Sequence, residues 1–284
     1  MIYISSSYTR AKTIRESVET LAGIGFKNIE LSGGTDYYTN LENDLLELQT
    51  KYGLSFICHN YFPPPREPIV LNLASLNGEI FERSLFHYKN AIELSHRLGA
   101  SVFGIHAGFL IDFQVSEIGK KLNHYKCFNR EEAIEQFCKG YSVLTSIARD
   151  LGVELYLENN VFSQDNFAIY SGGNPFLMTH YDEFEFLSKL IKINLLLDVG
   201  HLKVSTTTLK LNFEDELEKM MSYAKYLHFS DNDSLHDQNQ AIKKESNLWQ
   251  ILSRYNLKQK TITLEIYDSL DKVKQSHSLL NSIM

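Results

Sequence analysis

Residues 194–201 read NLLLDVGH, a short apolar run that ends in a carboxylate and an imidazole. Such a run, apolar at consecutive positions, is typical of a strand buried on both faces, as the strands of a parallel sheet are. Similar runs occur along the whole chain. They predict strands at 2–5, 27–31, 54–59, 101–106, 153–158, 194–198, 225–230 and 261–266.

Longer amphipathic segments lie between these runs. Three of them, 9–23, 78–98 and 129–151, carry apolar side chains at helical spacing and stop at glycine. Weaker helical patterns occupy 42–52, 181–191, 213–224, 246–253 and 270–282. Eight strands alternating with eight helices predict an α/β fold, a (β/α)8 TIM barrel, built as a single domain over residues 1–284. An open doubly wound sheet would carry a glycine-rich phosphate loop after its first strand, and SSSYTR at 5–10 is not one.

The composition is that of a globular protein. Of 284 residues, 43% are hydrophobic and 22% are charged, which excludes a disordered or fibrous chain. The net charge of −7 does not favour a surface that binds nucleic acid. Three cysteines without CxxC spacing predict neither a disulfide framework nor a thiolate zinc site. Because neither an export signal nor an apolar run of about 18 residues is visible, we expect a cytoplasmic protein without a membrane partner.

Two connections are too long for routine turns and are candidate substrate loops, at 107–128 and 159–180. The first leads into 119–130, GKKLNHYKCFNR, where basic and aromatic residues alternate. This stretch would suit an anionic group or nucleic acid, and an ordinary solvated loop is equally compatible with it. In the second connection, Gly172 and Gly173 suggest a turn.

The C-terminal ends of the strands are where a barrel of this kind carries its active site. Seven of the eight predicted strands end in a carboxylate or an imidazole: Glu30, His59, His106, Glu158, Asp198, His228 and Glu265. Several anionic oxygens cannot share a water-poor mouth without a cation that offsets their repulsion. The pattern therefore predicts a bound divalent metal.

Four of these residues form the candidate ligand set, namely Glu158, Asp198, His228 and Glu265. Three carboxylates and one imidazole suit Mn²⁺, Mg²⁺ or Co²⁺ and tolerate Zn²⁺, and we expect one such ion. His201 follows closely and is a candidate for a second metal or for the substrate. His59 and His106 end apolar strands, so each is either part of the site or a satisfied core histidine.

Seven segments resemble, in this order, those of the xylose isomerase-like barrels: GFKNIEL, HNYFPPPREPIVLNLAS, GIH, LYLEN, LLLDVGH, YLHFSDND and TLEIY. That superfamily includes sugar isomerases and epimerases of the D-tagatose 3-epimerase type, and endonuclease IV. The resemblance extends from about residue 20 to residue 268. It implies a small-molecule sugar as the partner and leaves homo-oligomerisation open.

The epimerase resemblance implies roles for the candidate residues. The four ligands align with the metal ligands of the epimerases, and His201 aligns with a histidine that contacts substrate. Glu158 and Glu265 would flank the substrate, where one removes a proton and the other returns one to a metal-stabilised enediolate. The implied activity is a divalent-metal-dependent isomerase or epimerase of a sugar, a sugar phosphate or a derivatised sugar. Asp231 and Ser234 stand where these epimerases carry glutamate and arginine, so the free ketohexoses are not specified. Asp231 and Asp237 are, like His201, candidates for the substrate or a second metal.

Endonuclease IV, a phosphodiesterase acting on abasic DNA, is the alternative. Its three-zinc site uses histidines at the positions of His59, His106, His201 and His228, together with the same acids. It also needs an Asp-x-His pair after the seventh strand. Asp237 fits that pair, but Asn239 takes the place of the histidine, so the third metal site is incomplete unless His236 substitutes after a shift in register. A sugar-binding barrel without catalysis, or a lyase or dehydratase, is a third class.

Overall fold

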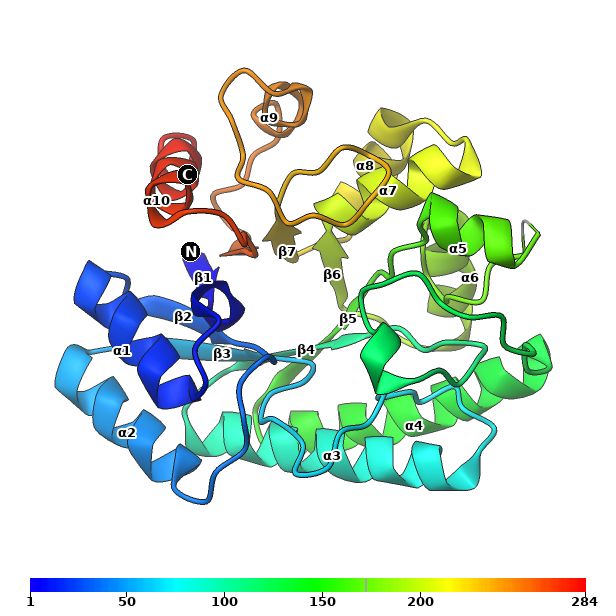
Figure 1. The fold of residues 1–284 in the computed structure, drawn as a ribbon, viewed down its shortest axis with the longest axis horizontal. Helices are drawn as coiled ribbons and strands as arrows, with labels where there is room; N and C mark the ends of the chain where they lie inside the picture. Colours follow the sequence, from blue (N-terminus) through cyan, green and yellow to red (C-terminus); the bar gives the residue numbers. More distant parts are fainter. Residues whose placement is uncertain (172) are drawn as a thin grey trace.

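The computed structural model describes residues 1–171 and 173–284, so Gly172 of the predicted Gly172–Gly173 turn lies outside the described residues. Within these ranges, eight parallel strands close into a barrel in chain order, with β8 paired to β1 (Figure 1). This confirms the predicted (β/α)8 TIM barrel. The strands are β1 (Ile2–Ser5), β2 (Asn28–Leu31), β3 (Ser55–His59), β4 (Val102–His106), β5 (Glu154–Glu158), β6 (Leu195–Asp198), β7 (Tyr226–Phe229) and β8 (Thr261–Leu264).

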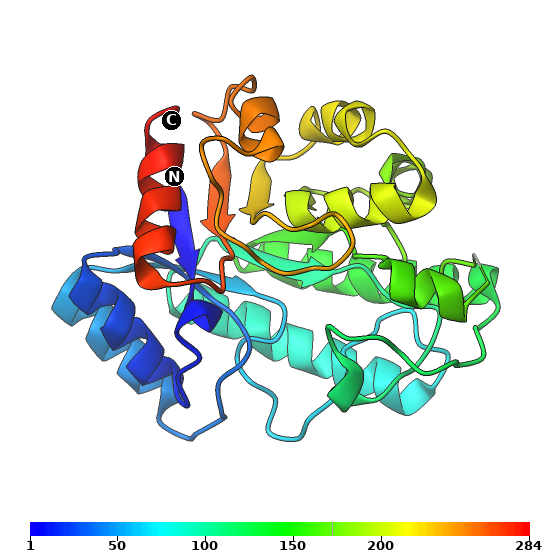
Figure 2. The same cartoon turned by 45° about the horizontal axis from the view of Figure 1, so that its top comes forward.

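Helices surround the strands, and α10 lies beside β1, so the two ends of the chain come together (Figures 1 and 2). The helices are α1 (Ile14–Ile24), α2 (Leu41–Tyr52), α3 (Gly78–Arg97), α4 (Arg130–Asp150), α5 (Gln164–Ile169), α6 (Tyr181–Leu190), α7 (Val199–Leu209), α8 (Phe213–Met221), α9 (Asn247–Leu252) and α10 (Leu270–Asn281). Short 3-10 turns are η1 (Ser6–Thr9) and η2 (Val115–Glu117). In the described part of the chain, no helix combines the length and the apolar character that crossing a membrane requires.

All eight predicted helices are present, and the largest boundary error concerns the first of them. The first helix was expected from residue 9 but begins at Ile14, because residues 6–9 form a 3-10 turn and Arg10 adopts a left-handed conformation with φ 51°. Thr13 is the N-cap. Its hydroxyl accepts from the backbone N–H of Glu16, whose carboxylate accepts in return from the N–H of Thr13. This capping box satisfies two N–H groups that a helix end leaves free.

Two helices, α5 and α7, were not predicted. Helix α7 is the important one, since it begins directly after Asp198. Most of its side chains are buried, so it shows no alternation between an apolar and a polar face, and its sequence VSTTTL is rich in β-branched residues. Both features hide it from a search for amphipathic periodicity. Its N-cap is Asp198, whose Oδ1 accepts from the backbone N–H of His201 at 2.6 Å.

Side chains alternate along each strand, and this alternation builds the barrel interior in layers. Five buried residues form the lower apolar layer: Tyr3, Ile57, Tyr156, Leu196 and Tyr226. Two positions further along four of these strands stand His59, Glu158, Asp198 and His228. The strand period therefore places these four polar side chains on the same inner face, directly above an apolar plug.

Gly104 on β4 provides a test of this packing. A Cβ atom there would lie 2.9 Å from Cδ2 of His59 and 2.9 Å from Cδ2 of Leu196, both in the barrel interior. We expect Gly104→Ala to destabilise the fold by about 1–3 kcal/mol, as overpacking of a well-filled core does. The matched control is Gly23→Ala in α1, where an added Cβ meets none of the described atoms within 4 Å.

Urea unfolding measures both variants. Gly23→Ala should stabilise the protein by about 0.5–1 kcal/mol because alanine favours the helix. A Gly104→Ala protein as stable as the wild type would contradict the close approach of His59 and Leu196.

Candidate metal centre

Four strands bring the predicted ligand set together. Glu158 ends β5, Asp198 ends β6, His228 lies in β7 and Glu265 follows β8. One donor atom from each lies within 4.8 Å of those of the others. His228 Nδ1 is at the centre: it lies 3.3 Å from Glu158 Oε1, 3.2 Å from Glu265 Oε2 and 3.8 Å from Asp198 Oδ2. We refer to these four residues as the four-residue cluster.

A second group of donor atoms shares Glu158. His59 Nε2 lies 2.6 Å from Glu158 Oε2, and His106 Nδ1 lies 3.2 Å from the same oxygen. These three residues also present donor atoms within 4.8 Å of one another. Glu158, which has no exposed surface, is therefore surrounded by imidazoles of His59, His106 and His228.

Several donor atoms of both groups lack a hydrogen bond. Within the described residues, Glu158 Oε1, His106 Nδ1 and His228 Nδ1 are buried and have no hydrogen-bond partner. A buried polar atom left in this state costs about 1–3 kcal/mol. Unpaired imidazole and carboxylate atoms that face one another are the donor set that a divalent cation accepts. The residues present thus fit a metal ion.

The pKa shifts of the carboxylates reflect the same crowding. Burial by itself would raise the pKa of Glu158, but the imidazoles of His106, His59 and His228 hold it well below its usual value. Burial likewise opposes ionisation of Glu265, and the nearby imidazole of His228 lowers its pKa to about 2. For Asp198, burial prevails and raises the pKa to about 7. Positive charge close to these acids therefore decides which of them ionise.

His201 lies beside the cluster at the start of α7. Its Nδ1–H donates to the carbonyl of Asn159 at 2.9 Å, while Nε2 lies 3.3 Å from Asp237 Oδ2. The Asp198 carboxylate accepts the His201 N–H through Oδ1, and its Oδ2 faces His228. Asp198 therefore positions His201 and contributes to the four-residue cluster with different oxygens.

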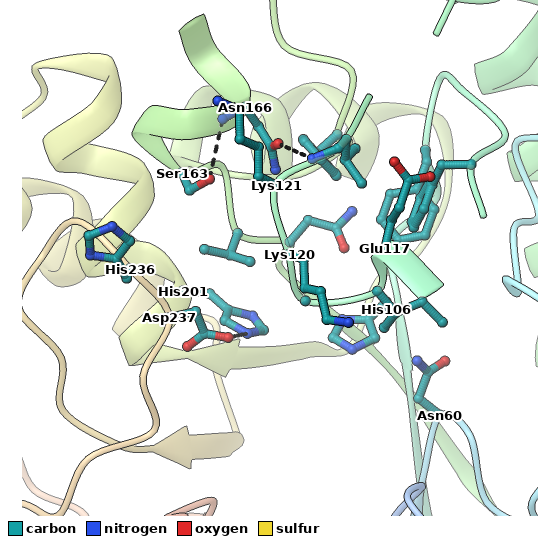
Figure 3. A pocket seen from close by; sticks show the side chains of 18 of the residues that line it. Asn60, His106, Glu117, Lys120, Lys121, Ser163, Asn166, His201, His236 and Asp237 are labelled. Atoms are coloured by element: carbon teal, nitrogen blue, oxygen red, sulfur yellow. Dashed lines mark hydrogen bonds and ion pairs between the residues drawn. The ribbon is translucent and has the colours of Figure 1, made fainter. Parts of the chain in front are cut away.

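A cavity of about 670 Å³ opens above these residues. His59, His106, His201 and Glu265 line it, and Phe109, Phe113 and Phe176 provide apolar wall. Figure 3 shows His201 and Asp237 together, with Lys120 and Lys121 on the loop that follows β4. Residues of both long connections, 107–128 and 159–180, line the cavity. This volume is in the usual range for small-molecule sites.

Not every candidate residue reaches the cavity. The Asp231 carboxylate binds Lys203 Nζ at 2.6 Å, and among the described residues it belongs to neither donor group nor to the cavity wall. The basic stretch 119–130 does not form one surface, because Lys120 and Lys121 line the cavity whereas Arg130 pairs with Glu183 at 2.9 Å.

Glu30 was recognised only as a strand-end carboxylate and was given no role. The structure places it inside the barrel with no exposed surface, and its Oε2 lies 2.9 Å from His228 Nε2. The signal in the sequence is a carboxylate between Ile29 and Leu31 in a predicted strand. The sequence of that strand does not reveal that Glu30 contacts His228 across the barrel.

The profile of the xylose isomerase-like TIM barrel family matches residues 18–283. The chain belongs to this family. The resemblance inferred from the short segments is therefore confirmed. No curated protein sequence matches the chain.

Solved structures share the fold of this xylose isomerase-like barrel over 99% of the chain. A D-tagatose 3-epimerase-like protein is 21% identical, with a TM-score of 0.73 over 96% of its own chain. D-Psicose 3-epimerase from Clostridium cellulolyticum H10, solved with D-tagatose, is 13% identical, with a TM-score of 0.67 over 97%. The TTHB071 protein from Thermus thermophilus, soaked with ZnCl₂, is 17% identical, with a TM-score of 0.63 over 97%. At these identities the likeness shows the shared fold alone.

Metal addition should stabilise the folded protein. An ion that binds the four-residue cluster and not the unfolded chain raises the stability by about 2.7 kcal/mol at a hundred times its dissociation constant. We therefore expect Mn²⁺ to raise the melting temperature of the wild type. Asp198→Asn keeps an oxygen that caps α7 but removes a charged ligand, so this rise should be largely lost.

Asp231→Asn is the matched control, because Asp231 is paired with Lys203 outside the cluster. It should retain the Mn²⁺-dependent rise in melting temperature. Differential scanning fluorimetry measures these melting temperatures. If Mn²⁺ raises the melting temperature of the wild type and of Asp198→Asn equally, the ion binds elsewhere.

Proposed function

We propose that this protein is a divalent-metal-dependent isomerase or epimerase of a sugar, a sugar phosphate or another derivatised sugar. We further propose that residues 1–284 act as one domain in a cytoplasmic enzyme. The observation that carries the proposal is the convergence of Glu158, Asp198, His228 and Glu265, of which Glu265 lines the cavity, with unpaired Glu158 Oε1 and His228 Nδ1 atoms. The names of the epimerases that share the fold support a sugar substrate.

The four-residue cluster would hold one ion, with Mn²⁺, Mg²⁺ or Co²⁺ preferred and Zn²⁺ tolerated. A bound divalent cation supplies positive charge beside substrate oxygens, which makes the adjacent C–H group acidic near neutral pH. The three carboxylates and the imidazole of the cluster all come from strand ends, so the closed sheet holds them in place.

Two carboxylates would move the protons. Glu265 lines the cavity with a side chain that is 14% exposed, so it can exchange a proton with a substrate carbon directly. Glu158 is the second carboxylate, and its Oε2 is held by His59 while Oε1 has no hydrogen bond within the described residues. Removal of a proton by one group and its return by the other inverts a carbon or moves the carbonyl to its neighbour.

The remaining cavity residues would bind the substrate. His106, His201 and Asp237 present polar atoms to the cavity beside the cluster, at positions suited to sugar hydroxyl groups. His59 reaches the same floor from β3. A cavity of about 670 Å³ with aromatic wall favours a sugar that carries a further substituent.

A phosphodiesterase of the endonuclease IV type, acting on abasic DNA, is the second candidate. The group of His59, His106 and Glu158 favours it, since these donor atoms would suit a second ion. Three observations favour the sugar enzyme over the phosphodiesterase. The net charge is −7, and Arg130 is paired with Glu183. Asn239 lines the cavity at the position where the phosphodiesterase would need a histidine ligand. DNA binding that weakens steeply with salt would reverse the order.

A panel of aldoses, ketoses and their phosphates, assayed with several divalent metals in D₂O, tests the proposed activity. Solvent deuterium should appear on a substrate carbon. Glu158→Gln and Glu265→Gln should each lower kcat by about 10²–10⁴-fold, the usual contribution of a general acid or base. Glu185→Gln, an exposed helix carboxylate paired with Lys189, is the control and should keep full activity. Substantial activity in Glu158→Gln or in Glu265→Gln would argue against the two-carboxylate mechanism.

Counting the bound ions separates the two candidates. Elemental analysis of the purified protein should find about one divalent ion per chain, and His106→Asn should leave that number unchanged because His106 is not in the four-residue cluster. Three zinc ions per chain, or the loss of one ion in His106→Asn, would favour the phosphodiesterase.

A further inference from the structure

Glu30 is a buried carboxylate that contacts His228 across the barrel interior. It lies in β2, and its side chain reaches His228 in β7, where Oε2 and Nε2 are 2.9 Å apart. Neither residue has exposed surface. Since β2 and β7 are separated in the ring by β8 and β1, this contact crosses the barrel and is not a contact between neighbouring strands.

Three hydroxyl groups donate hydrogen bonds to Glu30. Thr263 Oγ1 donates to Oε2 at 3.0 Å, the Tyr226 hydroxyl donates to the same oxygen, and Ser32 Oγ donates to Oε1 at 3.0 Å. A carboxylate buried in this way is costly unless it is fully hydrogen-bonded, and these donors come from β7, β8 and the end of β2. Among its described partners there is no lysine or arginine, so His228 is the basic group that faces it.

The contact decides which nitrogen of His228 carries a hydrogen. Glu30 accepts hydrogen bonds from three hydroxyl groups, and we infer that the nitrogen that faces it, Nε2, donates to it as well. A neutral imidazole has a single N–H, and Nδ1 is therefore the nitrogen with a free lone pair. Nδ1 is the buried atom without a hydrogen bond that faces Glu158, Asp198 and Glu265.

We propose that Glu30 is a positioning residue: it holds His228 in the Nε2–H tautomer and directs Nδ1 at the four-residue cluster. The inference deepens the proposed function, on which it rests, by adding a residue that never touches the ion or the substrate. A carboxylate that accepts from the far side of a ligating imidazole also makes that imidazole a stronger donor to a metal.

Metal affinity tests the role of Glu30 directly. Glu30→Gln preserves the size of the side chain and removes its charge. We expect its dissociation constant for Mn²⁺, measured by isothermal titration calorimetry, to rise by about 10–100-fold, as it does when such partners of metal-bound histidines are changed. Ser32→Ala is the matched control. It removes a hydrogen bond from the other oxygen of Glu30 and leaves the contact with His228 in place, so its affinity should stay within about twofold of the wild type.

A spectroscopic measurement separates positioning from a purely structural role. In Zn²⁺-loaded protein labelled with ¹⁵N-histidine, the wild type should show His228 with a proton on Nε2 and the metal on Nδ1, assigned with His228→Asn. In Glu30→Gln this Nε2–H signal should shift or broaden by exchange. Glu30→Asp retains the charge one methylene further away, so it serves as a second variant if Glu30→Gln folds poorly, and its affinity should also fall.

The outcomes distinguish this inference from the proposed function. If the wild type binds Mn²⁺ and both Glu30 variants bind it equally well, the role of Glu30 is refuted while the metal enzyme stands. If the wild type binds no divalent ion at all, both proposals fail. A lower melting temperature with unchanged affinity and an unchanged His228 spectrum would make Glu30 structural only, which also overturns the inference.

Discussion

Mutual repulsion among buried carboxylates is the constraint on which the rest of the site depends. Glu158, Asp198 and Glu30 are almost completely buried within one barrel interior. In a medium of low dielectric constant, lost hydration and like-charge repulsion destabilise the ionised forms unless positive charge or hydrogen bonds offset them. The chain provides imidazoles for this purpose. His59, His106 and His228 all approach Glu158 within 3.3 Å, and their charge state depends on the acids as much as the reverse.

The barrel meets this constraint by dividing its interior into layers. The lower layer is apolar and aromatic, and it closes the barrel below the polar groups. The layer above it collects carboxylates and imidazoles from β3 to β8, which the closed sheet keeps at short distances. Glu30 lies inside the barrel as well, where it meets side chains from β7, β8 and the residue that follows β2. Because the strands are tied in a ring of hydrogen bonds, these positions are more rigid than positions on loops.

The candidate metal ligands and much of the cavity wall are therefore located on different parts of the fold. The donor atoms stand at the strand ends, whereas much of the cavity wall comes from the long connections after β4 and β5. This division is general in TIM barrels, since loops can change without disturbing the strands. Asp231 lies in the loop after β7, where it pairs with Lys203 of α7 and is not part of the four-residue cluster.

The sequence by itself determined the eight strands, the alternation with helices and the residues at the strand ends, because strand burial and side-chain alternation are local properties. It could not show α7, since a helix buried on most sides has no polar face to mark it. It also gave no role to Glu30. Only the closed ring brings β2 and β7 to opposite sides of one interior, where Glu30 meets His228. Which atoms face each other across a barrel depends on register and closure, and these are settled by contacts between residues far apart in the chain.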